Sequence, residues 1–339
     1  MVRNSLFASV ALTLLCVFVA QATVVPTLGL DRVTNEASLI AVGQITLVRR
    51  VEKTTVQFGD RTLPAWAMLA ELHVGHVLKG TAKSLPSSLS FRFLVPDEFV
   101  GWASIAPQTY RVFFLAESSG ELRLADPYFP SVAAIPGTET QGETAIERVI
   151  NELGAVLEST RTSPEEKREA IFTLNSSKNP AAIRVLRHIA DVKDIILRLS
   201  VAAALLEHND ISTLQFAEEA LLKQDPALPP HLYLLHNLSY AISEGVKDER
   251  AVPSLTKLLH VSSVETRRAA ASALMHVGST SCIDPLLSAI GDADFQVRYF
   301  SVTGLAEITG QMDWRPNMDD FKSDQGKYLR HWRDWSQSR

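Results

Sequence analysis

Histidines are the first residues to test for chemistry, because suitably spaced pairs bind metal ions or transfer protons. His73 and His76 are three residues apart in an expected strand, so they should point to opposite faces. His231 and His236 are five apart on an expected helix, again a weak metal-binding geometry. The sequence has no His-Glu-x-x-His, no Gly-x-Ser-x-Gly and no glycine-rich phosphate loop. These residues therefore predict no catalytic site, no metal and no cofactor.

Cys282 and a set of recurring arginines are the other candidates for chemistry. A nucleophilic cysteine needs a histidine beside it, and Cys282 lies next to Ile283 in an expected helix, so a buried apolar role is favoured. Recurring arginines could bind an acidic ligand; they are Arg198, Arg267 and Arg298. We favour the alternative that they connect neighbouring helices through acids such as Asp294.

The composition is that of a folded protein with little affinity for nucleic acid. The chain has 339 residues, of which 46% are hydrophobic and 21% charged, enough to bury a core. Its formal net charge of −5 argues against broad neutralisation of phosphates. We expect a protein partner of unknown identity and no nucleic acid.

The first 22 residues have the pattern of a secretory signal peptide. Arg3 precedes the uncharged run Leu6–Val19, and Ala20-Gln21-Ala22 is a small-x-small cleavage signature. The run is short for a membrane span, which needs about 20 residues, although an uncleaved anchor is the alternative. Cleavage after Ala22 leaves Cys282 as the single cysteine, so no intramolecular disulfide can form. We expect a periplasmic or extracellular protein of a bacterial envelope, with no stable membrane span after cleavage.

Residues 23–134 have the pattern of a small β domain. Short β-branched and aromatic runs alternate with Gly, Pro, Ser and Asp. Five strands are predicted, at Leu39–Val48, Ala67–Leu78, Leu89–Leu94, Tyr110–Leu115 and Glu121–Leu124. Because a small antiparallel sheet gains by removing its free edges, we expect it to close into a barrel.

Three of these segments resemble a known family. Ala37–Ile45, Val77–Gly80 and Tyr110–Leu115 resemble the tissue-inhibitor/netrin-like β-barrel of the OB-fold type, found in exported bacterial proteins. Animal members use cysteines at the start of the domain to bind a protease's metal. No cysteine lies between Thr23 and Cys282, so the resemblance does not imply protease inhibition here.

A linker at residues 135–143 separates this region from one with helical periodicity, at residues 144–310. One apolar landmark recurs there at intervals of 31, 37, 32 and 31 residues: Leu174, Leu205, Ile242, Leu274 and Leu305. A basic residue stands seven positions before four of the five landmarks: Lys167, Arg198, Arg267 and Arg298. The register predicts five helical hairpins.

The last two hairpins carry a family resemblance. Val264–Leu274 and Phe295–Leu305 share Thr-Arg or Val-Arg followed by spaced small residues and Leu, and Pro253 recurs as Pro285 in the preceding helices. This pattern resembles HEAT repeats, which implies an α-α superhelix whose second helices line a concave binding surface.

The C-terminal segment, residues 311–339, is rich in aromatic residues. Tyr328, Trp332 and Trp335 follow an i, i+4, i+7 spacing, which places them on one helix face. We expect an aromatic cap on the last hairpin, because solenoids must cover their exposed end. The alternative is a membrane-surface or nucleic-acid patch, since the segment is locally basic.

The predicted fold class is therefore α+β and multidomain, with an OB-like β-barrel followed by a HEAT-like solenoid. The predicted function is that of an exported, non-catalytic interaction or scaffolding protein. The alternatives are an envelope lyase or hydrolase on a HEAT scaffold, and a ligand-sensing regulator that uses the β-barrel.

The repeat register also predicts a binding face. The position after the basic landmark should form a row along the second helices, made of Arg168, Leu199, His236, Arg268 and Tyr299. Its mixture of basic, aromatic and apolar side chains is common at interface anchors. The alternative is that these side chains pack between hairpins.

Overall fold

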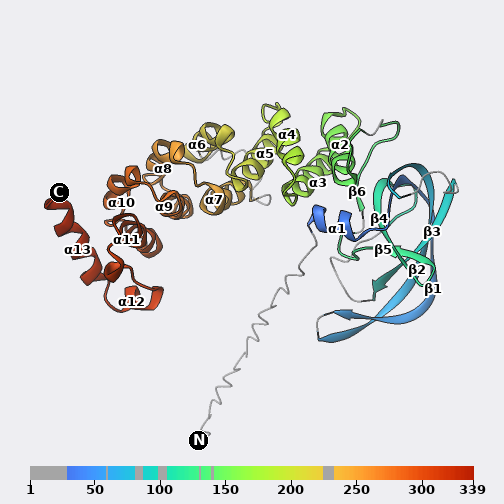
Figure 1. Cartoon of the computed structure of the whole chain (residues 1–339), viewed down its shortest axis with the longest axis horizontal. Helices are drawn as coiled ribbons and strands as arrows, with labels where there is room; N and C mark the ends of the chain where they lie inside the picture. The colour runs from blue at the N-terminus through green and yellow to red at the C-terminus, as the bar shows by residue number, and fades with distance from the viewer. Residues whose placement is uncertain are drawn as a thin grey trace, which may run out of the picture.

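The computed structural model describes seven stretches of the chain: residues 29–58, 60–80, 87–97, 105–129, 131–138, 141–223 and 233–339. The expected signal peptide and His231 lie outside them. A β-sheet region at the N-terminal end is followed by a curved row of helices that ends in α13 (Figure 1). None of the described helices combines the length and hydropathy that crossing a membrane requires.

The N-terminal region is one mainly antiparallel sheet. Its described strands are β1 (Leu39–Phe58), β2 (Arg61–Lys79), β3 (Ser88–Pro96), β4 (Tyr110–Ser118), β5 (Glu121–Leu124) and β6 (Ser131–Ala133). They pair in the order β1-β2-β3-β5-β4-β6, and β4 also pairs with β1. Strands β3 and β5 share a single parallel pair, Arg92 with Arg123. The pairings thus form a ring that is uneven between β3 and β5.

All five predicted strands are present, but β1 and β2 are much longer than expected. Strand β1 continues beyond residue 48, and β2 begins before residue 67. The two extensions pair as a two-stranded arm in which most side chains on both faces are exposed, so the apolar alternation is lost. Trp66 supports the arm, with Arg50 and Lys53 lying 5.0 and 5.3 Å from its ring centre. Strand β6 was not predicted, because three residues carry too little pattern.

The helical region contains five helix pairs within the described residues, as the register predicts. The outer helices are α2 (Ala145–Glu158), α4 (Pro180–His188), α6 (Leu214–Lys223), α8 (Val252–Leu258) and α10 (Ile283–Ala289). The inner helices are α3 (Pro164–Asn175), α5 (Ile195–Glu207), α7 (Leu234–Gly245), α9 (Val264–Val277) and α11 (Phe295–Thr309). Each inner helix packs on the next, and Figure 1 shows them along the inner side of the curve.

Local sequence explains where the helices begin and how closely they approach. Thr144 and Ser163 form capping boxes at the starts of α2 and α3, and Asp294 caps α11. A Cβ atom at Gly304 would lie only 2.9 Å from Leu286 Cδ1 and 3.2 Å from Met275 Cα. The small residue at this position therefore permits close packing of α11.

Two short helices follow the last pair, α12 (Met318–Ser323) and α13 (Gln325–Gln337). Helix α13 contacts α10 and α11. Phe321 and Trp332 are fully buried, and Tyr328 is 7% exposed, in the same apolar core as the last helix pairs. The aromatic face that the sequence predicts on α13 therefore packs against the protein.

The sheet and the first two helix pairs share one apolar core. Side chains of β1, β2, β4 and β6 pack in one cluster with α2 to α5; Val42 and Phe114 belong to it on the sheet side, and Val149 and Leu153 on the helix side. The unpredicted helix α1 (Leu30–Glu36) lies at this junction, where Asp31 accepts hydrogen bonds from Ser177 and Lys178. Residues 135–138, the described start of the expected linker, therefore lie beside a packed interface.

Candidate functional site

Polar contacts fasten the sheet to α2. His76 Nε2 on β2 lies 2.6 Å from Oε1 of Glu152, a fully buried residue of α2, and Arg148 donates to the Leu78 carbonyl at 2.6 Å. Burial raises the pKa of the nearby Tyr110 hydroxyl, and the negative charge of Glu152 raises that pKa further. His76 therefore has a structural role at the junction, while His73 is exposed on the same strand.

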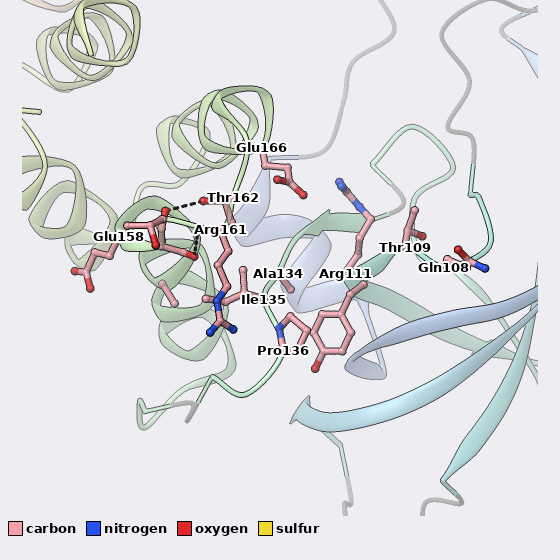
Figure 2. Close-up of a pocket in the computed structure, with 14 residues that line it drawn as sticks. Gln108, Thr109, Arg111, Ala134, Ile135, Pro136, Glu158, Arg161, Thr162 and Glu166 are labelled. Atoms are coloured by element: carbon pink, nitrogen blue, oxygen red, sulfur yellow. Dashed lines mark hydrogen bonds between the residues drawn. The ribbon is translucent and has the colours of Figure 1, made fainter. Parts of the chain in front are cut away.

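An open groove lies beside this junction, with a volume of about 820 Å³ (Figure 2). Strand β4, residues 134–136 and the turn between α2 and α3 line it. Arg111 donates to Ser131 Oγ at 2.7 Å and pairs with Glu169, whereas the Arg161 side chain extends along the groove. The described lining residues include no histidine or cysteine, so they offer polar binding groups of both charges without a nucleophile–base pair.

The five residues of the predicted row occupy equivalent positions on the five inner helices. They do not form one exposed stripe, because Leu199 is 1% exposed within the core. Its helix, α5, is apolar on most sides and is covered on both flanks by α3 and α7. Partner binding by this row stays a prediction.

Side-chain partners explain the positions of the other four residues in the row. Arg168 pairs with Glu165 on its own helix at 3.0 Å, and His236 pairs with Glu265 of the next inner helix. The Tyr299 ring packs against Phe300 and Phe321, with ring centres 5.8 and 5.7 Å apart. Arg268 holds Asp294 with two hydrogen bonds of 2.9 and 2.6 Å. Much of the row therefore engages neighbouring hairpins.

Two of the three recurring arginines connect neighbouring units through hydrogen bonds, whereas Arg198 pairs with Asp191 at 3.2 Å, just before its own helix. Arg267 binds both carboxylate oxygens of Asp292 in the next hairpin, at 2.8 and 3.1 Å, and Arg298 binds Gln325 at 3.2 and 2.7 Å. Each also donates Nη1 to two backbone carbonyls five and six residues earlier. The structural interpretation fits these contacts, but the expected acid differs: Asp294 is the partner of Arg268, and Arg267 uses Asp292.

The other candidates for chemistry have no catalytic arrangement within the described residues. Cys282 is fully buried, and its Sγ lies 3.6 Å from Ser279 Oγ. The described part of the chain contains no group of three or more His, Cys, Asp or Glu residues placed to hold a metal ion.

Sequence reasoning missed two large exposed aromatic side chains of the inner helices. Phe172 on α3 and Tyr240 on α7 are 69% and 58% exposed. Both stand two residues before their repeat landmark, and Ala203 of α5 has the same position. The repeat register could have revealed them, because the position two residues before the landmark is aromatic in two of the five units.

The comparisons with known proteins support the HEAT-like interpretation of the helical region. Residues 252–332, from α8 into α13, match the family described as HEAT repeats. No curated protein sequence matched the chain. The resemblance of the sheet region to the tissue-inhibitor/netrin-like family stays a prediction.

Three solved structures are similar to part of the chain. An engineered protein is 17% identical, with 48% of this chain and 81% of that chain covered and a TM-score of 0.36. The complex of CpcE and CpcF of phycocyanin lyase from Nostoc sp. is 19% identical, with 53% and 71% covered and a TM-score of 0.36. YibA of Escherichia coli is 14% identical, with 51% and 71% covered and a TM-score of 0.33.

Proposed function

We propose that this protein is an exported, non-catalytic scaffold that binds a protein partner on the inner layer of its helices. The observation that supports this most is the exposure of Phe172 and Tyr240 at equivalent positions of that layer. Large aromatic side chains are frequent anchors of protein interfaces, and stacked hairpins present such anchors on a continuous surface.

Site-specific photocrosslinking in the native host tests this function. A photoreactive amino acid replaces Tyr240 in the inner layer or, as a control, Leu222 on the outer helix α6, which is 49% exposed. We expect a discrete adduct with one protein from position 240 and none from position 222. Equal adducts from both positions, or none from position 240, would contradict the proposal.

Export is a separate part of the proposal and has its own test. The pattern of Arg3, Leu6–Val19 and Ala20-Gln21-Ala22 supports a mature chain that begins at or near Thr23. N-terminal sequencing of the exported protein should find that start. Retention of Met1 in a membrane fraction that resists carbonate extraction would instead indicate an uncleaved anchor.

The finer architecture is also proposed here. The pairing of β4 with β1 supports an OB-like barrel. In this barrel β3 and β5 would be joined by a single residue pair. The burial of Trp332 against the last helix pairs supports a terminal cap.

A ligand-sensing regulator is the second candidate, and the groove beside the junction favours it. Arg161 would meet an anionic group there, and a ligand would touch both the sheet and α2. Thermal denaturation with a panel of small carboxylates and phosphates tests this, with Arg161→Ala as the variant. A stabilisation that disappears in Arg161→Ala would favour the regulator; no stabilisation by any compound would count against it.

A further inference from the structure

Phe172, Ala203 and Tyr240 occupy the same register position on the consecutive inner helices α3, α5 and α7. The two aromatic residues are 69% and 58% exposed, whereas Ala203 is 7% exposed. A small side chain therefore separates two large exposed ones. We call these three residues, together with Glu207 and Glu244, the aromatic-acidic face.

Glu207 and Glu244 lie four residues after Ala203 and Tyr240, so they share the same side of α5 and α7. Both are exposed, and Glu207 accepts a hydrogen bond from Asn175 Nδ2 at 2.7 Å, which shows that the ends of α3 and α5 lie side by side. Each glutamate stands in the last turn of its helix, where the helix dipole is already negative. Neither helix has a basic residue in that turn, so negative potential accumulates at this edge.

Three cations of α3, α7 and β4 are paired with acids. Arg168 pairs with Glu165, Arg111 pairs with Glu169, and His236 pairs with Glu265. These three pairs therefore add little net charge to the aromatic-acidic face.

Phe172 also borders a recess that suits an apolar side chain. The recess has a volume of about 510 Å³ and lies between α3 and the sheet, where Ile105, Phe113 and Phe129 line it together with Phe172. An apolar anchor inserted there would cover Phe172, and a second anchor could pack on Tyr240.

We infer that the aromatic-acidic face binds a basic, amphipathic segment of the partner protein. Its apolar side chains would cover Phe172 and Tyr240, and its Lys or Arg side chains would pair with Glu207 and Glu244. Charge complementarity selects this occupant: the edge is acidic and the chain carries a net charge of −5, so a nucleic acid or an anionic membrane surface would be repelled. The inference rests on the proposed scaffold function and names the chemistry of its partner.

Fluorescence anisotropy with synthetic 18-residue helical peptides tests the inference. One peptide is built from Leu and Lys with a single apolar side, and a matched peptide has Glu in place of Lys. We expect saturable binding of the Lys peptide alone, weakened at least tenfold by Phe172→Ser with Tyr240→Ser, and at least tenfold by Glu207→Gln with Glu244→Gln. The glutamine variants keep an acceptor for Asn175, and all four side chains are exposed or at the helix ends, so thermal unfolding should be unchanged.

Matched control variants lie on the outer helix α6. Leu222→Ser and Glu219→Gln remove an exposed apolar residue and an exposed acid there, and they should leave binding of the Lys peptide unchanged. Equal loss in the α6 variants, or equal binding of the Glu peptide, would overturn the inference. A partner crosslinked at position 240 that lacks a basic amphipathic segment would overturn it while the scaffold function stands; absence of any such partner removes the scaffold function itself.

Discussion

Asp294 connects two neighbouring inner helices through one carboxylate. It accepts hydrogen bonds from the backbone nitrogens of Gln296 and Val297 at 2.9 and 3.1 Å, and so caps α11. The hydrogen bonds from Arg268 on α9, more than any other contact, hold the pKa of Asp294 at about 2, against an ordinary value of 3.8. Because the folded-state pKa is depressed, this contribution to stability is complete above about pH 4 and is lost as the pH falls towards 2.

Arg268→Gln should lower the free energy of unfolding at pH 7 by about 1 kcal/mol, a figure reduced for the partial exposure of Arg268. The variant should also lose less stability than the parent between pH 4 and pH 2. Urea unfolding followed by circular dichroism at several pH values measures both effects. Lys322→Gln is the control, because its pair with Asp319 is exposed on both sides. Parallel pH curves for parent and Arg268→Gln would contradict this account.

The repeat register places functional candidates correctly on helices but does not determine their exposure. It assigned the five row residues to equivalent inner-helix positions, yet Leu199 is buried while His236 is exposed. Exposure depends on the size and chemistry of side chains from adjacent helices, which a single position does not encode. The sequence also could not predict which acid binds which arginine. Asp292 and Asp294 are only two residues apart, and the fold of the turn decides that Asp292 binds Arg267 and Asp294 binds Arg268.

At the scale of helices, glycines on α7 and α2 should respond in opposite ways to an added methyl group. A Cβ atom at Gly245 would lie 2.0 Å from the Leu206 carbonyl oxygen and 2.5 Å from Glu207 Cα, so α7 would have to move away from α5. At Gly154, in the interior of α2, the nearest atoms are Val185 methyls at 3.5 and 3.7 Å, an ordinary contact.

Gly245→Ala should therefore lower the free energy of unfolding by about 1–3 kcal/mol, and Gly154→Ala should raise it by about 0.5–1 kcal/mol because alanine favours the helix. Chemical denaturation of the two variants beside the parent gives both values. A Gly245→Ala variant as stable as the parent would show that the spacing of α5 and α7 is not set by Gly245.

The helices after residue 310 allow a second test at this scale. Truncation after Thr309 removes the buried Phe321 and Trp332 and exposes the apolar sides of α10 and α11. Since the loss of one buried aromatic side chain costs about 3–5 kcal/mol, we expect aggregation or loss of cooperative unfolding, measured by light scattering and calorimetry. A truncated protein that is as stable as the parent but no longer binds liposomes would indicate the membrane-surface alternative.

The periodicity of the sequence predicted which segments are strands and which are helices, but it did not predict their lengths. The five strands and five helix pairs carry clear periods of two and 3.6 residues. The arm of β1 and β2 and helix α1 were missed or shortened, because the arm has no buried face and α1 has only seven residues. Helix α1 is held by contacts with Ser176, Ser177 and Lys178, which its own sequence pattern does not reveal.

For the whole molecule, the shared core makes the sheet and the first helix pairs one packed body. The loop at residues 135–143 should be the first site of limited proteolysis, since its composition is that of a linker. The two products should then elute together in gel filtration, because Phe114 and Val149 belong to one buried cluster. Separate elution of the fragments would show independent domains, and a protease-resistant fragment from Ser90 to Ser200 would show that the loop is protected.

The two ends of the helical row differ in kind, with a β-sheet against the first pairs and α12 and α13 against the last (Figure 1). Neither end can accept an additional hairpin without losing its own packing. Gene duplication could therefore lengthen this protein only from within. The most tolerant place is between α9 and α11, where consecutive units are 31 residues apart and repeat the same arginine contacts to the preceding carbonyls. Homologues that differ in length should carry their extra or missing hairpin there, with both ends of the row retained.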